Sequence, residues 1–190
     1  MATQFAMKLA QIAQDLHDEF HLTTENDPPL SKQIQKFWTD IGFSFPGVDQ
    51  PWSAVFVSFC VKQAGAKASE FNFNPAHSQF VNAAIQNGLS NLGVFRGHDI
   101  TGHAPNIGDI IHVNRNGNTF DFDFARTHKK YNSHSAIVVE VGVDPGGPFA
   151  LTIGGNESDS IRSSLVRLTN SGLIKQRPRN PYICVIEDLK

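Results

Sequence analysis

The stretch QPWSAVFVSFCVKQAG, residues 50–65, decides how this chain folds. After its Pro-Trp pair it is apolar on almost every side of a helix, and Gly65 supplies a stop signal. A helix that is hydrophobic all round is normally buried. We therefore expect a buried helix over residues 53–64, with the rest of the chain packed around it. Ser53 opens this helix and carries a hydroxyl that can act as a nucleophile.

Length and composition fit one globular domain. The chain has 190 residues, of which 40% are hydrophobic, enough to bury a sizeable core. A net charge of −2, from 16 basic and 18 acidic residues, is too small to argue for nucleic acid or an anionic membrane as partner. Cys60 and Cys184 lie in apolar stretches, which predicts two buried, free thiols. We predict a single domain over residues 1–190.

The first 20 residues, MATQFAMKLAQIAQDLHDEF, predict an amphipathic helix and not a signal peptide. They lack a basic start followed by an unbroken apolar run, and their apolar residues recur at helical spacing. The sequence also lacks an apolar run of about 20 residues that could span a membrane. We expect synthesis in the cytoplasm without a signal peptide. A substrate in the periplasm or cell wall would then require export by a specialised secretion system.

The pattern changes from helical to extended near residue 104. Helices are predicted for the N-terminal face formed by Phe5, Leu9, Ile12, Ala13 and Leu16, and for residues 31–41, 53–64 and 78–86. Strands are predicted at 109–113, 135–141, 149–153 and 182–186, with a long polar loop over 114–133. This order predicts an α+β domain, with a helical part over 1–103 and an antiparallel sheet over 104–190.

Three polar residues are candidates for a catalytic triad. Acyl transfer needs a nucleophile, a histidine that takes and returns its proton, and a polar group that orients the histidine. Ser53 opens the buried helix, His134 precedes one predicted strand, and Asn156 follows the next. Packing the helix on the sheet would bring the three together. Each also has a simpler reading: a helix N-cap, a surface histidine and a turn residue, respectively.

Several blocks of this sequence resemble one bacterial family. The blocks are PWSAVFVS at 51–58, AHS at 76–78, GDI at 108–110, SHSAIVV at 133–139 and IGGN at 153–156. Together they resemble the family catalogued as domain of unknown function 2272, which is similar to the NlpC-type and CHAP peptidoglycan hydrolases. The resemblance covers about residues 8 to 168. It implies a papain-like fold in which Ser53 stands where cysteine is usual in those hydrolases, and serine at this position is usual for the family itself.

The resemblance implies hydrolysis of a peptidoglycan amide bond, as an amidase or an endopeptidase. Ser53 would attack, His134 would act as general base and then acid, and Asn156 would hold the imidazole. Where Cys-Asp is expected after the histidine, this chain has Ser-Ala, so Asn156 would act alone. A helix N-terminus that ionises a thiol cannot ionise a hydroxyl, so activity depends on a histidine within reach.

An alternative function and the route of delivery both stay open. The alternative function is a catalytically weak or inactive binding module, in which the cleft holds a cell-wall fragment or a protein partner. The route of delivery would be that of an exported antibacterial effector, which implies a cognate immunity protein, or of a phage lysis protein. Neither involves nucleic acid or a membrane as partner.

His77 and Trp52 are candidate substrate-binding residues. His77 lies just before the helix predicted over 78–86, where it could line the cleft as a second proton-transfer or substrate-binding group, or simply bond the backbone. Trp52 could form a wall of the groove, although a core position is favoured for a ring of this size.

We expect no metal and no other cofactor. His112, His134 and Asp109 are conceivable ligands, but they show neither H-E-x-x-H nor paired-cysteine spacing. Asp121 and Asp123 lack the glycine and the terminal glutamate of a calcium-binding EF-hand.

Overall fold

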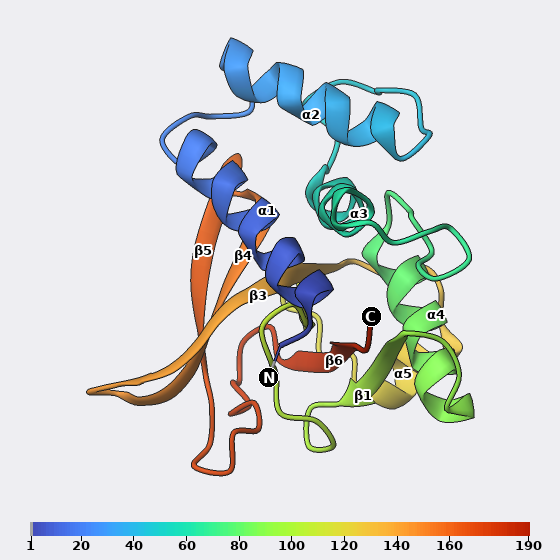
Figure 1. Cartoon of the computed structure of the whole chain (residues 1–190), viewed down its shortest axis with the longest axis vertical. Helices are drawn as coiled ribbons and strands as arrows, with labels where there is room; N and C mark the ends of the chain where they lie inside the picture. The colour runs from blue at the N-terminus through green and yellow to red at the C-terminus, as the bar shows by residue number, and fades with distance from the viewer. Residues whose placement is uncertain (1) are drawn as a thin grey trace.

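The computed structural model describes residues 2–190 and shows helices packed on a six-stranded antiparallel sheet (Figure 1). The helices are α1 Gln4–Phe20, α2 Pro28–Asp40, α3 Ser53–Ala64, α4 His77–Ser90 and α5 Phe122–Thr127. The strands are β1 Phe95–Asp99, β2 Ile110–Asn114, β3 Ser133–Asp144, β4 Gly147–Glu157, β5 Ser160–Arg167 and β6 Tyr182–Asp188. The α+β class predicted from the sequence is confirmed.

The strand order in the sheet is β1-β6-β2-β3-β4-β5. The long strands β3, β4 and β5 follow one another as an antiparallel meander, whereas β6 from the end of the chain inserts between β1 and β2. Helices α1 and α3 pack against β3 and β4, and α4 packs against β1. Helix α2, at the top of Figure 1, contacts α3 on the side away from the sheet. None of the helices within residues 2–190 is long and apolar enough to cross a membrane.

The two faces of the sheet carry separate hydrophobic clusters, because successive side chains in a strand point to opposite faces. The larger cluster joins the helices to the sheet through residues such as Phe56, Ile137 and Ile153. The smaller cluster lies on the other face and includes Val138 and Val185. In β3, odd-numbered positions near the strand start therefore face the helices, and even-numbered positions face away from them.

Helix α3 occupies the centre of the domain, as its apolar sequence predicts. All of its residues from Ser53 to Val61 are buried, and it ends at Gly65, whose φ of 115° is left-handed. Strand β4 approaches α3 closely: a Cβ at Gly155 would lie 2.6 Å from Cβ of Phe56. Glycine at this position lets the strand reach the first turn of the helix.

Cys60 and Cys184 are both free and buried, as predicted. Burial in apolar surroundings raises the pKa of each thiol. Cys60 is therefore unsuited to replace Ser53 as a nucleophile.

Three elements differ from the sequence prediction. Strand β1 lies inside the part predicted to be helical, and β5 follows β4 where no strand was predicted. Both are strands at the edges of the sheet, with polar sequences FRGHD and SIRSSLVR that lack the apolar alternation of a half-buried strand. Helix α5 lies within the predicted loop over 114–133, and the side chain of Asp121 caps it by accepting from the Phe124 N–H at 2.8 Å.

Candidate active site

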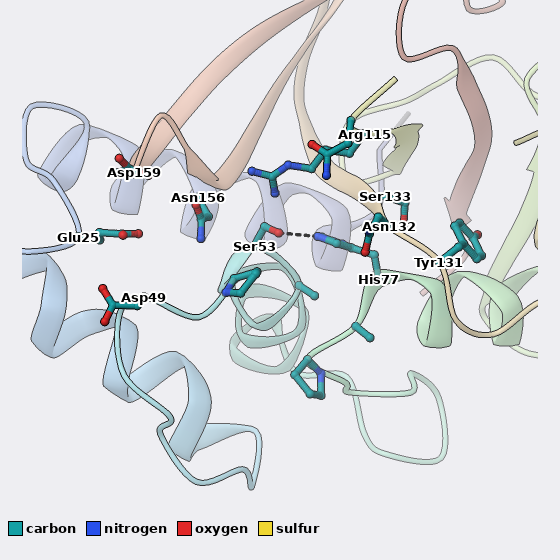
Figure 2. Close-up of a pocket in the computed structure, with 15 residues that line it drawn as sticks. Glu25, Asp49, Ser53, His77, Arg115, Tyr131, Asn132, Ser133, Asn156 and Asp159 are labelled. Atoms are coloured by element: carbon teal, nitrogen blue, oxygen red, sulfur yellow. Dashed lines mark hydrogen bonds between the residues drawn. The ribbon is translucent and has the colours of Figure 1, made fainter. Parts of the chain in front are cut away.

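Ser53 and His77 meet where two helices begin. Ser53 is the first residue of α3 and His77 is the first residue of α4. Ser53 Oγ lies 2.7 Å from Nε2 of His77, and both side chains are buried (Figure 2). Ser53 is therefore not the N-cap of its helix: Trp52 occupies that position, and no side chain in residues 2–190 caps α3. The hydroxyl is thus free to bond an imidazole.

The His77 ring is held in its neutral form. Burial, followed by the nearby His134 and His112, lowers the pKa of His77 well below 6.5. Its Nδ1 is buried and has no hydrogen-bond partner within the described residues. When the ring proton is on Nδ1, Nε2 can accept the proton of Ser53, as a general base must. The third member of a triad, a polar group on Nδ1, has no counterpart among residues 2–190.

His134 is not the hydrogen-bond partner of Ser53, which corrects the prediction. Its Nε2 lies 2.8 Å from Oε1 of Glu157, and its ring centroid is 5.3 Å from that of His77. The reason is strand parity, since His134 occupies an even-numbered position of β3, next to Ser135, which faces the helices. Although burial raises the pKa of Glu157, the hydrogen bond and the charge of His134 hold it below its usual value.

Asn156 does not orient His134 either. It sits at a β-bulge in β4, between Gly155 and Glu157, with a left-handed φ of 55°. With its amide oxygen turned toward Trp52, it accepts from the backbone N at 3.1 Å and from Nε1 at 3.2 Å. The extra residue of the bulge changes which side chain faces His134, so Glu157 makes the contact predicted for Asn156. The acidic residue directly after GGN was the signal that sequence reasoning missed.

Trp52 is part of the core, as its size favoured, and does not line the cavity at Ser53, which corrects its assignment as a candidate substrate-binding residue. Its side chain is fully buried. Its Nε1 donates to Oε2 of Glu25 at 2.8 Å, and its ring packs 6.1 Å from that of Phe37 on α2. The ring fits against Gly155, so it fixes the start of α3 against both α2 and β4.

A cavity of about 490 Å³ opens at Ser53 and His77. Figure 2 shows the charged residues that line it, namely Glu25, Asp49, Asp159 and Arg115. Carboxylates outnumber the single guanidinium, which favours a ligand with a cationic group. The first turn of α3 begins at the cavity wall, where its uncapped N–H groups can bind a negatively charged oxygen.

The metal ligands considered from the sequence do not form one site. His112 is fully buried; its Nδ1 lies 2.8 Å from Ser135 Oγ and its Nε2 lies 3.2 Å from Tyr131 Oη. Burial, with a smaller effect of His134, lowers the pKa of His112 to about 3. Asp109 bonds His103 instead.

The part of the chain that contains this site matches the model of a bacterial protein family. Comparison with curated proteins and with solved structures finds no match. The family described as "Uncharacterized protein conserved in bacteria (DUF2272)" matches residues 27–186, a range that includes Ser53, His77, His134 and Glu157. Because this range covers most of the chain, the protein belongs to the DUF2272 family.

Proposed function

We propose that this protein hydrolyses an amide bond of peptidoglycan, with Ser53 as nucleophile and His77 as general base. The observation that carries the proposal is the 2.7 Å hydrogen bond between Ser53 Oγ and His77 Nε2, two residues that line a cavity. The substrate class rests on the resemblance to the NlpC-type and CHAP hydrolases. In their papain-like arrangement the nucleophile opens a buried helix that packs on an antiparallel sheet, as Ser53 opens α3.

The proposed reaction has two halves. Ser53 Oγ attacks the carbonyl carbon while its proton passes to Nε2 of His77, and the uncapped N–H groups of α3 stabilise the oxyanion. His77 then gives the proton to the leaving amine, the C–N bond breaks, and an ester remains on Ser53. In the second half His77 takes a proton from water as the water attacks the carbonyl carbon of the ester. The bond from this carbon to Ser53 Oγ then breaks, His77 gives its proton to Ser53 Oγ, and the acid is released.

The charges of the cavity suit a peptide stem. Glu25, Asp49 and Asp159 favour the amino group of a stem, and Arg115 favours one of its carboxylates. Both the bond between stem and muramic acid and a bond within the stem remain candidates under this proposal. Product masses decide between them.

A binding module is the second candidate, and two properties of His77 favour it. Its pKa is lowered and its Nδ1 has no partner among residues 2–190, so this histidine is a weaker base than one oriented by a carboxylate. In this alternative the cavity holds a wall fragment or a protein partner, and no bond is cleaved.

Digestion of purified peptidoglycan, followed by mass spectrometry of the products, tests the proposal. We expect cleavage by the parent protein, loss of cleavage in Ser53→Ala, and a fall of about 10²–10⁴-fold in His77→Gln. His134→Gln is the matched control, because it changes a neighbouring histidine that does not bond Ser53. A larger loss in His134→Gln than in His77→Gln would return the role of base to His134.

Ser53→Cys separates the enzyme from the binding module. In a thiol-type site the helix N-terminus and His77 stabilise a thiolate, so this variant should cleave faster than the parent. In a site suited to serine it should cleave more slowly. A binding module predicts that the parent, Ser53→Cys and Ser53→Ala all bind insoluble peptidoglycan equally and release no products. Equal, nonzero cleavage by all three would remove Ser53 from the mechanism.

A further inference from the structure

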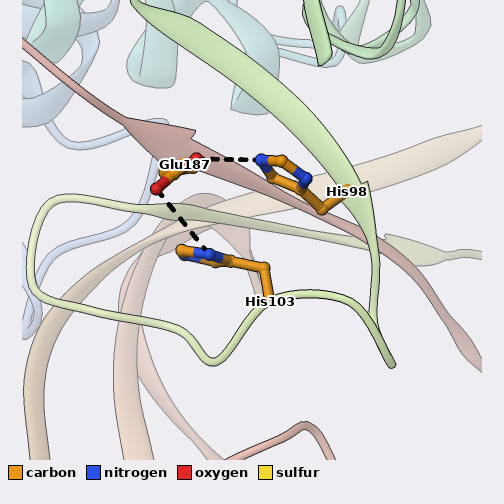
Figure 3. Close-up of side chains that lie close together, drawn as sticks. All are labelled: His98, His103 and Glu187. Atoms are coloured by element: carbon orange, nitrogen blue, oxygen red, sulfur yellow. Dashed lines mark hydrogen bonds and ion pairs between the residues drawn. The ribbon is translucent and has the colours of Figure 1, made fainter. Parts of the chain in front are cut away.

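We propose that His98, His103 and Glu187 form a zinc-binding site at the β1 edge of the sheet (Figure 3). One donor atom from each side chain lies within 4.8 Å of the other two, and all three residues are partly buried. The three residues are distant in the sequence and converge only in the folded chain. None of them belongs to the Ser53 cavity or to the proposed hydrolysis.

The backbone brings these side chains to one face. His98 lies on β1 and Glu187 on β6, which pair so that Arg96 is opposite Glu187 and His98 is opposite Val185. His98 and Glu187 are therefore diagonal neighbours on the same face of the sheet. His103 comes from the loop that follows β1, and its ring stacks on that of His98 with centroids 5.2 Å apart.

The distances suit a tetrahedral zinc ion. Nε2 of His98 lies 2.9 Å from Oε2 of Glu187, and Nδ1 of His103 lies 3.9 Å from Oε1 of the same carboxylate. Zinc bonds of about 2.0–2.1 Å place tetrahedral ligand atoms about 3.4 Å apart. These two separations, to different oxygens of Glu187, lie on either side of this value, and one donor atom of each residue lies within 4.8 Å of the other two. Side-chain rotations would therefore be needed to bring the three donor atoms to one zinc ion.

Asp109 supplies a second, independent indication. Its side chain is 2% exposed, and Oδ2 lies 2.8 Å from Nε2 of His103. The backbone N–H groups of Asn106 and Asp188 hold this carboxylate at 2.8 and 2.9 Å. A histidine that donates one ring N–H to a buried carboxylate presents its other nitrogen as a ligand, the usual arrangement around zinc. Here that nitrogen is Nδ1, and it faces Glu187.

The donor set suits zinc. Two imidazoles and one carboxylate suit zinc, whereas magnesium and calcium prefer oxygen ligands throughout. Bound zinc would tie the edge strand β1 and the loop carrying His103 to β6, and would leave a fourth position for water. Because zinc bound here would join three segments of the chain, we assign it a stabilising role in the fold.

Titration of the EDTA-treated, tag-free protein with zinc chloride in a calorimeter tests the site. We expect one zinc per chain and a higher Tm with zinc. His103→Gln and Glu187→Gln should each weaken binding by at least about 10–100-fold, the loss typical of even an outer partner of a ligand. Neither variant should show the zinc-dependent rise in Tm, and thermal unfolding without zinc verifies that each is folded.

The double variant His17→Gln/His21→Gln is the matched control. His17 lies on α1 and His21 is its C-cap, and their rings stack with centroids 4.8 Å apart, as the rings of His98 and His103 do. The control should bind zinc as the parent does. The proposal is overturned if the parent binds no stoichiometric zinc, if His103→Gln and Glu187→Gln bind it as tightly as the parent, or if the control loses it.

Discussion

The buried, neutral His112 should make the free energy of unfolding of this protein depend on pH. The substitution His112→Asn should remove the part of this pH dependence that His112 causes. The pKa of His112 is about 3 in the folded state, against 6.5 for an ordinary histidine. Burial is the main cause of this lowering, and the nearby His134 is a smaller one. Between these two values the unfolded chain binds a proton that the folded chain excludes. The free energy of unfolding therefore falls as the pH drops below 6.5.

The size of the effect follows from the proton balance. One proton bound only by the unfolded chain changes the free energy of unfolding by about 1.4 kcal/mol per pH unit. From pH 6.5 to about pH 5, His112 alone should cost about 2 kcal/mol. His77, which faces His112 across 6.4 Å between ring centroids, adds to the loss with the same sign. Asp188 opposes this loss of stability. Burial raises the pKa of its carboxyl to about 6, so as the pH falls the folded chain binds this proton at a higher pH than the unfolded chain does.

Urea unfolding at a series of pH values between about 7 and 5 measures this slope. His112→Asn loses contacts to Ser135 and Tyr131, so its free energy of unfolding is lower than that of the parent at every pH. The quantity compared is therefore the slope of the free energy of unfolding against pH. We expect the slope of His112→Asn to be smaller than that of the parent by about 1 kcal/mol per pH unit averaged from pH 7 to 5, and by close to about 1.4 kcal/mol per pH unit near pH 5. The contributions of His77 and Asp188 largely cancel in this comparison.

His128→Asn is the control, because it changes a histidine that is exposed at the end of α5. This variant should keep the slope of the parent. Equal slopes for the parent and His112→Asn would refute the argument that a buried neutral histidine controls acid stability.

Three further predictions concern the packing and chemistry of the site. Gly155→Ala should lower the free energy of unfolding by about 1–3 kcal/mol and slow any hydrolysis, because its Cβ would lie 2.6 Å from Phe56 Cβ. The control Gly102→Ala, whose Cβ would have its nearest contact at 3.4 Å, should change neither the stability nor the hydrolysis. Cys60 and Cys184 should react with a thiol reagent only after urea unfolding, and rapid labelling of the folded protein would contradict their burial. The kcat/KM for peptidoglycan should be flat near pH 7–8 and fall only in acid, because the pKa of His77 is lowered; a rise between pH 7 and 8 would point to another base.

Local patterns in the sequence determined the main elements of this fold. The apolar run from Ser53 to Ala64 predicts a buried helix because its sequence leaves no polar face for solvent, and α3 has the predicted bounds. The apolar runs of β2, β3, β4 and β6 predict strands for the same local reason. Edge strands β1 and β5 could not be found in this way, because their polar sequences resemble those of loops.

Only the tertiary structure decided which side chains meet. Ser53 bonds His77 and not His134, because α4 begins beside α3 while strand parity and the bulge at Asn156 pair His134 with Glu157. Likewise, Glu187 joins the two histidines of the β1 edge only because β6 inserts between β1 and β2. Periodicity specifies the face on which a residue lies within its own element. Long-range packing, which no local pattern encodes, determines what that face touches.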